Sequence, residues 1–221
     1  MSSAENRLLA FITSNEPRDN FLRCLFISVL GLLAYSNTFN SPFSFDDTAN
    51  LQDNPFITSF SFASLKQAFE SRRAIGIISF QLNYLMTGWN LPWFHLTNLI
   101  IHISAALIAS QLVKLFMKTP YTEKYADEEF RQLPIPFFVA LFFVAHPVQT
   151  QAVTYIVQRF SSLATLFYLA AIVSYLKVRL TQVEAGRVLS IRTLIWAVSA
   201  LLLGFLAFYS KEPPILQHQG R

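Results

Sequence analysis

Residues 94–116 read FHLTNLIIHISAALIASQLVKLF, a nearly uninterrupted apolar stretch. At about 1.5 Å per residue, a helix of this length crosses a hydrocarbon core of about 30 Å. Four further apolar segments surround it in the sequence, at 21–39, 135–145, 163–176 and 194–209. The segments at 135–145 and 163–176 are short, so we expect both to recruit part of 148–160. The pattern predicts an all-α polytopic membrane bundle of about five spans.

Composition supports a membrane protein. Of the 221 residues, 53% are hydrophobic and only 14% are charged, whereas soluble domains carry about a quarter charged residues. The net charge of +4 could suggest nucleic-acid binding. We exclude nucleic acid as a partner because the basic residues flank apolar segments and form no stripe. Cys24 is the single cysteine, so no disulfide forms within the chain.

The distribution of Lys and Arg predicts the orientation. A cytoplasmic N-terminus places most of the 17 basic residues on the inside, as the positive-inside rule requires. We expect a cytoplasmic segment at 1–20, a transmembrane domain at 21–216, a loop at 40–93 outside the cytoplasm (the periplasm, if the bacterial resemblance described below holds) and a short tail at 217–221. A further apolar run starts at Ile215-Leu216 and is cut off, so we expect a truncated chain.

The long loop at 40–93 is too apolar to be disordered. Residues 64–72 are expected to form an amphipathic helix on the membrane surface, with Leu65, Ala68 and Phe69 on one face. The stretch 83–92 has the composition of a turn, and Trp89 and Trp93 are expected to anchor it at the interface.

Two adjacent carboxylates, Asp46 and Asp47, follow the first apolar segment. Acids near hydrocarbon are costly and often functional. One could act as a general base on an acceptor hydroxyl, while the other orients it or binds a cation. The structural alternative is that Asp46 caps a short helix beginning near Thr48.

Polar residues also interrupt the later apolar segments. His95, Asn98 and His102 share one helical face; they would line a cavity or, as we favour, pack between helices. The sequence offers no zinc ligand set around them, and a need for a divalent metal stays open.

His146-Pro147 breaks the third apolar segment, and Gln151 follows the break; at such a break His146 and Gln151 would line the rim of a cavity. Arg159 is expected at the outer surface, as a phosphate ligand or as an arginine that reaches the lipid head groups. Lys211 would meet a lipid-linked phosphate with Glu212 holding it in place, or form an ordinary ion pair with Glu212. No phosphate-binding glycine loop, G-x-S-x-G elbow or H-E-x-x-H motif is present.

Four blocks taken together resemble a known family. They are Tyr35-Ser36-Asn37-Thr38-Phe39 through Phe45-Asp46-Asp47 to Asp53-Asn54-Pro55-Phe56-Ile57, then Leu82-Asn83-Tyr84 through Phe94-His95-Leu96-Thr97-Asn98 to His102, then 146–159 (HPVQTQAVTYIVQR), and Ser210-Lys211-Glu212. In this order they are similar to the transmembrane and tetratricopeptide-repeat O-mannosyltransferases and their bacterial relatives.

The resemblance implies the N-terminal part of a GT-C glycosyltransferase. Such an enzyme takes a sugar from a polyprenyl-phosphate carrier and transfers it to a protein or glycan acceptor outside the cytoplasm. An acid matching Asp46 or Asp47 would be the base, and residues matching Arg159 and Lys211 would meet the carrier phosphate. Gln151 resembles bacterial members, which implies a bacterial inner membrane. A membrane scaffold remains an alternative, and a transporter is a weaker one because no related second half is visible.

Overall fold

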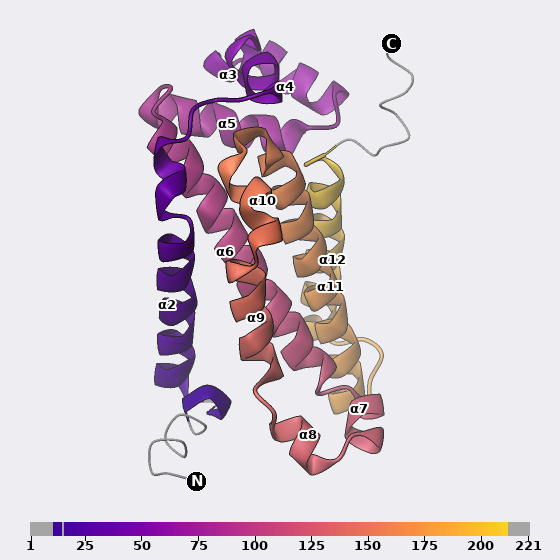
Figure 1. The fold of residues 1–221 in the computed structure, drawn as a ribbon. Coiled ribbons are helices and arrows are strands. Elements are labelled where there is room, and N and C mark those ends of the chain that lie inside the picture. The colour runs from indigo at the N-terminus through magenta and orange to yellow at the C-terminus, as the bar shows by residue number, and fades with distance from the viewer. Residues whose placement is uncertain (1–10, 15, 212–221) are drawn as a thin grey trace.

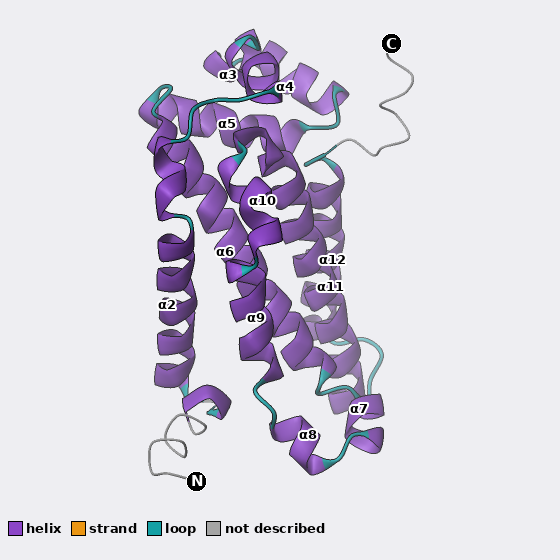
Figure 2. Ribbon diagram, in the orientation of Figure 1, coloured by secondary structure: helices purple, strands orange, loops and turns teal. Residues whose placement is uncertain are grey.

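The computed structural model describes residues 11–14 and 16–211, and every regular element within them is helical, which confirms the predicted all-α fold (Figures 1 and 2). The main elements are α2 (Pro17–Ala34), η1 (Ser36–Asn40), η2 (Thr48–Gln52), α3 (Pro55–Thr58), α4 (Phe62–Glu70), α5 (Ala74–Thr87), α6 (Leu91–Phe116), α7 (Pro120–Tyr125), α8 (Glu128–Gln132), α9 (Ile135–Ala145), η3 (Pro147–Gln149), α10 (Thr150–Thr154), η4 (Ile156–Gln158), α11 (Arg159–Ala185) and α12 (Ile191–Phe208).

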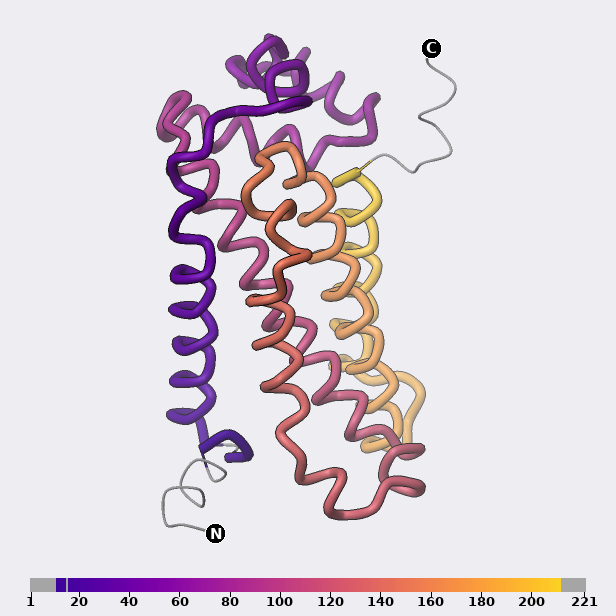
Figure 3. The backbone as a smooth tube through the Cα atoms, viewed as in Figure 1, coloured from indigo at the N-terminus to yellow at the C-terminus, as the bar shows by residue number. Residues whose placement is uncertain are grey.

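Helix α6 lies at the centre of the bundle and contacts α2, α5, α9 and α11, while α12 packs along α11. Figure 3 shows these long helices following one axis. Helices α3, α4 and α5 gather at one end, which we call the loop end. Helices α7 and α8 lie at the other end, which we call the opposite end (Figure 1). The last described turn of α12 reaches the loop end.

Three helices are long and apolar enough to cross a membrane: Leu91–Phe116, Ile156–Ala185 and Ile191–Phe208. The pair Ile135–Ala145 and Pro147–Thr154, bent by 51°, makes a fourth if it counts as one span. By length and composition the described residues thus hold three or four candidate spans, and the predicted count of about five stays a prediction. The predicted segment at 21–39 begins in α2, which carries Arg18, Asp19 and Arg23 within its first two turns.

The break at His146-Pro147 has a local cause. Pro147 has no N–H to continue the ladder, and His146 has an extended backbone that ends α9. The side chain Nδ1 of His146 accepts a hydrogen bond from the N–H of Val148 and so caps η3. As expected, the short apolar segments recruit the intervening stretch, because α10 continues one of them and α11 begins at Arg159.

The loop end is a folded cover of short helices. A helix forms near the expected range 64–72: α4 spans Phe62–Glu70 and begins with a capping box between Ser61 and Ser64. Of the expected apolar face, Ala68 is buried but Phe69 is exposed, and the position of α4 on a membrane surface stays a prediction. The expected turn at 83–92 is shorter in the structure, because α5 runs to Thr87 and α6 begins at Leu91. Trp89 is partly buried, and its ring stacks with that of Phe94 at 5.9 Å at the edge of an aromatic cluster; its role as an interface anchor stays a prediction. Trp93 is half exposed.

Candidate functional site

Arg159, at the first position of α11, is the largest fully buried side chain of the described residues. Its Nε donates to Asn98 Oδ1 at 2.7 Å, and Nη2 donates to Asn83 Oδ1 and to the carbonyl of Phe94, both at 2.9 Å. Nη1 donates to the carbonyl of Ser79 at 3.3 Å. The guanidinium also lies over the ring of Phe80, 4.1 Å from its centroid.

This geometry corrects the expected position of Arg159 at the outer surface. A buried guanidinium must be hydrogen-bonded to be tolerated, and this one gives its donors to α5 and α6. Its N–H groups point at oxygen atoms of the protein, in the positions that the oxygen atoms of a phosphate ligand would have to occupy. Arg159 therefore ties α11 to α5 and α6, and its occupied donors do not support the phosphate role predicted for it.

The stripe on α6 packs against backbone rather than a cavity, as the alternative we favoured expects. Asn98 donates to the carbonyls of Val153 and Ile156. His102 Nε2 donates to the carbonyl of Val144 at 3.4 Å, and His95 Nε2 donates to that of Ser41 at 2.9 Å. All three side chains are buried. They bond carbonyls of the interrupted 144–156 segment and of the first loop, so the cavity-lining prediction is corrected for them.

Asp47 is fully buried and holds two chain segments together. Its Oδ1 accepts from the N–H of Val157 at 2.7 Å, and its Oδ2 accepts from the N–H of Ser44 at 3.0 Å. Burial raises the pKa of the Asp47 carboxyl above its usual range, although the two N–H groups and the nearby His95 act in the opposite direction. The carboxylate makes no capping bond to η2. Asp47 is thus a positioning residue that fixes the loop on the 155–157 segment.

Asp46 differs from its neighbour because its side chain is exposed. Its N–H donates to the hydroxyl oxygen of Tyr155 at 2.9 Å. Burial raises the pKa of the Tyr155 phenol, and the carboxylates of Asp46 and Asp47 raise it further, so the hydroxyl stays protonated at neutral pH. The preceding Phe45 has φ of +49° and is 91% exposed. A left-handed aromatic residue is strained, and such strain is often found at functional sites.

The structure does not bring the remaining predicted site residues together around Asp46 and Asp47. Lys211 is exposed, and its Nζ donates to Ser161 Oγ at 2.9 Å at the loop end. Gln151 and His146 are exposed on the broken segment. Glu212 lies outside the described residues. Within the described part of the chain, no three His, Cys, Asp or Glu side chains are grouped as metal ligands.

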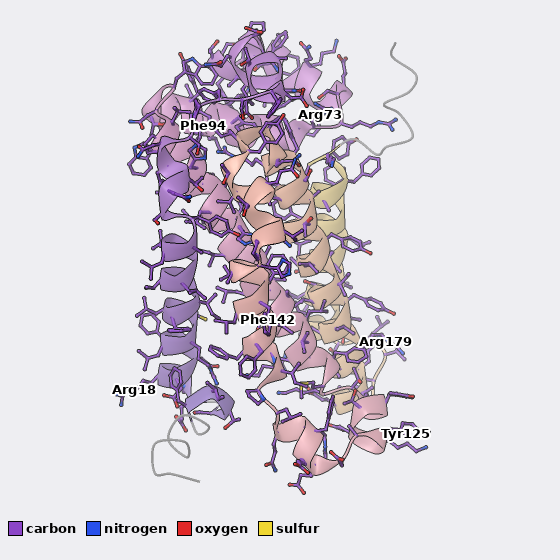
Figure 4. The ribbon with its side chains drawn as sticks, in the orientation of Figure 1. Arg18, Arg73, Phe94, Tyr125, Phe142 and Arg179 are labelled. Carbon is purple, nitrogen blue, oxygen red and sulfur yellow. The ribbon has the colours of Figure 1, made fainter. Side chains whose placement is uncertain are left out.

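A polar pocket of about 120 Å³ lies next to the acid-bearing loop. It is lined by Asn50, Asn54, Gln67 and Arg73, with Phe160 as part of its apolar wall. Asn50 connects the pocket to the acid, because its Nδ2 donates to the carbonyl of Asp46 and its Oδ1 accepts from Arg73 Nη1. Figure 4 shows Arg73 and Phe94 at the loop end and Arg18, Tyr125 and Arg179 at the opposite end.

Sequence reasoning missed Tyr155, Asn83 and Arg73. Tyr155 and Asn83 lie inside the blocks quoted for the family resemblance, so their membership in those blocks was the available signal. Arg73 carried no signal, because Arg72 and Arg73 look like ordinary basic residues of a loop. The structure brings three of the blocks together at the loop end through Arg159, Asn98 and Asp47.

These observations define an all-helical membrane bundle with an acid-bearing loop docked on a broken helix. The chain is similar to protein O-mannosyl-transferases. It is 29% identical to Tmtc3 of Drosophila melanogaster over 184 residues, covering 74% of this chain and 20% of the relative. It is 30% identical to TMTC1 of Mus musculus over 198 residues, covering 83% and 20%, and 28% identical to TMTC2 of Homo sapiens over 164 residues, covering 68% and 18%.

The comparison confirms the resemblance that the motifs predicted. The chain spans about a fifth of the length of the curated relatives it matches. No protein-family model matches the chain, and no solved structure matches it significantly.

Proposed function

We propose that this chain supplies the acid-bearing part of a GT-C type membrane glycosyltransferase. The enzyme would transfer a sugar from a polyprenyl-phosphate carrier to a protein or glycan acceptor. By analogy with the relatives named O-mannosyl-transferases, the sugar would be mannose. The similarity to proteins named O-mannosyl-transferases supports the reaction class. The carrier, the acceptor and the GT-C architecture belong to the proposal.

The proposal rests on one observation: the two adjacent acids differ in burial and in hydrogen bonding. Asp47 is buried and uses both carboxylate oxygens to fix the loop. Asp46 is exposed, and its backbone is held by the Tyr155 hydroxyl and by Asn50. A general base must be accessible and rigidly positioned. Asp46 meets both conditions, so we assign it as the catalytic base and Asp47 and Tyr155 as positioning residues.

The proposed step is a displacement at the anomeric carbon. Asp46 takes the proton of the acceptor hydroxyl as that oxygen bonds to the anomeric carbon. The bond from this carbon to the carrier phosphate oxygen breaks, and its electron pair leaves with the phosphate. A cation near the phosphate stabilises the developing charge.

Arg73 is the cation we assign to that phosphate. Its pocket adjoins the acid loop through Asn50, and its volume of about 120 Å³ suits a group of a few heavy atoms. A planar guanidinium matches phosphate oxygens. Lys211 lies at the same end and is a second candidate, held by Ser161 in this structure.

The orientation is part of the proposal. The distribution of basic residues supports an orientation with the loop end outside the cytoplasm, where a lipid-linked sugar donor of this class would be used. A bacterial inner membrane stays a prediction from Gln151 and the family resemblance.

The test measures sugar transfer from a polyprenyl-phosphate donor in proteoliposomes, using the full-length protein. Asp46→Asn should lower kcat by about 100-fold or more, with little change in KM for the donor. Arg73→Gln should raise KM for the donor and lower kcat, while Arg192→Gln, an exposed arginine at the opposite end, should leave both unchanged. Full activity of Asp46→Asn would remove the assigned base. Absence of transfer by the unmodified protein, with normal folding, would favour a membrane scaffold.

A further inference from the structure

A second cavity lies at the opposite end, far from the acid loop in the fold. It has a volume of about 410 Å³, within the range of small-molecule sites. Helices α2, α6 and α9 and the connection 117–134 line it. Nothing in the proposed transferase reaction uses it.

Positive charge dominates the polar part of this cavity. Arg23, Lys114, Lys118 and Arg131 line it, and Glu123 is the acid among its lining residues. Arg23 is part of the frame, because its Nη groups donate to the carbonyls of the 11–14 segment and to a side chain of α2. Lys118 and Arg131 are exposed and lie in the connection after α6. The cavity therefore presents an excess of cations to a ligand.

The other wall is apolar. Ile27 of α2, Leu107 of α6 and Phe137 of α9 line it, and Ile27 is buried in the cluster that joins these three helices. The basic residues lie near the ends of spanning helices, where hydrocarbon meets water. A cationic rim above an apolar wall fits an amphiphile with an anionic head, and basic pockets between membrane helices bind such head groups.

We propose that this cavity binds an anionic glycerophospholipid, with its phosphate at Lys114, Lys118 and Arg131 and an acyl chain along Ile27, Leu107 and Phe137. The bound lipid would fill the space between α2 and the α6–α9 pair and so fix α2 on the bundle. This site is separate from the acid loop, so it does not depend on the proposed reaction.

Cys24 provides a built-in reporter, because it lines the cavity, is exposed and is the single cysteine of the sequence. The purified chain in a nonionic detergent is titrated with phosphatidylglycerol, and the rate of Cys24 reaction with a maleimide is measured. Phosphatidylglycerol should slow the reaction in a saturable way. Phosphatidylcholine with the same acyl chains should not. Equal protection by the two lipids would overturn the assignment of an anionic head group.

The paired variants locate the site. Lys118→Gln with Arg131→Gln should raise the half-protecting lipid concentration about thirtyfold, since each basic residue near the surface contributes about 1 kcal/mol. The matched control is Arg187→Gln with Arg192→Gln, which removes the same charge from exposed arginines outside the cavity. An equal loss in the control pair would show diffuse surface attraction and overturn the proposal.

Two further measurements test a free anion and replace the double variant if it does not fold. Inorganic phosphate added to the chain in detergent tests a free anion; protection as strong as that by the lipid would replace the lipid with soluble phosphate and contradict the proposal. If the double variant fails to fold, Lys118→Gln alone and added salt on the unmodified chain replace it. Both should weaken protection by phosphatidylglycerol, because screening reduces exposed charge interactions, and insensitivity to both would also contradict the proposal.

Discussion

The charged side chains that hold the loop end together differ in burial from those that line the cavity at the opposite end. At the loop end, Arg159 and Asp47 are fully buried, and backbone or amide groups occupy their polar atoms. At the opposite end, Lys118 and Arg131 are exposed around a cavity. Burying a charge is costly unless it is hydrogen-bonded, so the loop end is built as a fixed frame. The opposite end retains cations that can meet a ligand.

The frame explains how a long connection can hold an exposed acid in a fixed position. Residues 41–45 have no regular secondary structure, yet His95, Tyr155 and the N–H of Val157 each form a hydrogen bond to the segment 41–47. Every partner comes from α6 or from the segment that follows the broken helix. Such supports hold a loop residue in one place, which is a requirement for catalysis.

The largest effect should come from removing the buried cation of the loop end. Arg159→Met leaves the acceptors of Asn98, Asn83 and Phe94 without their donor, so we expect a loss of about 4 kcal/mol or more of folding free energy. The midpoint of thermal unfolding in detergent measures it. Arg192→Met, an exposed arginine of the opposite end, is the matched control and should change the midpoint little. Equal midpoints for the two variants would contradict the contrast between the ends.

The next effect separates the two acids. The Asp47→Asn substitution replaces one of the two carboxylate oxygens with an NH₂ group. One of the backbone N–H donors of Ser44 and Val157 therefore loses its acceptor and faces another donor. We expect a loss of about 1–3 kcal/mol of stability. Asp46→Asn should leave the unfolding midpoint unchanged while lowering kcat for sugar transfer by about 100-fold or more. A midpoint that falls equally in both variants would show that Asp46 is also structural.

The sequence was sufficient for the apolar helices, because length and hydropathy determine them without knowledge of packing. It also located the acid pair and the break at Pro147, since both depend on local chemistry. It could not separate Asp46 from Asp47, because burial of one of two adjacent acids depends on contacts with residues more than 100 positions away. Arg159 was misplaced for the same reason: its acceptors are distributed over α5 and α6.

Close packing at the loop end gives a smaller but clean test. A Cβ on Gly76 of α5 would lie 2.1 Å from the ring of Phe160 on α11, so Gly76→Ala should cost about 1–3 kcal/mol through overpacking. Gly204 of α12 meets nothing within 4 Å. Gly204→Ala should therefore be neutral or stabilise by up to about 1 kcal/mol. The two unfolding midpoints measured side by side test the approach of α5 to α11, and tolerance of Gly76→Ala would contradict it.

The smallest effect is a pH dependence that only the buried acid should produce. The pKa of Asp47 in the folded chain is raised by burial, so between its unfolded and folded pKa the folded state binds more protons than the unfolded state. The free energy of unfolding then falls as the pH rises through this window, by at most about 1.4 kcal/mol per pH unit, and is constant above it. Unfolding midpoints measured from acid to neutral pH should show this slope in the unmodified chain and in Asp46→Asn, but not in Asp47→Asn. A slope that persists in Asp47→Asn would assign the titration to another group and leave Asp47 as an ionised clamp.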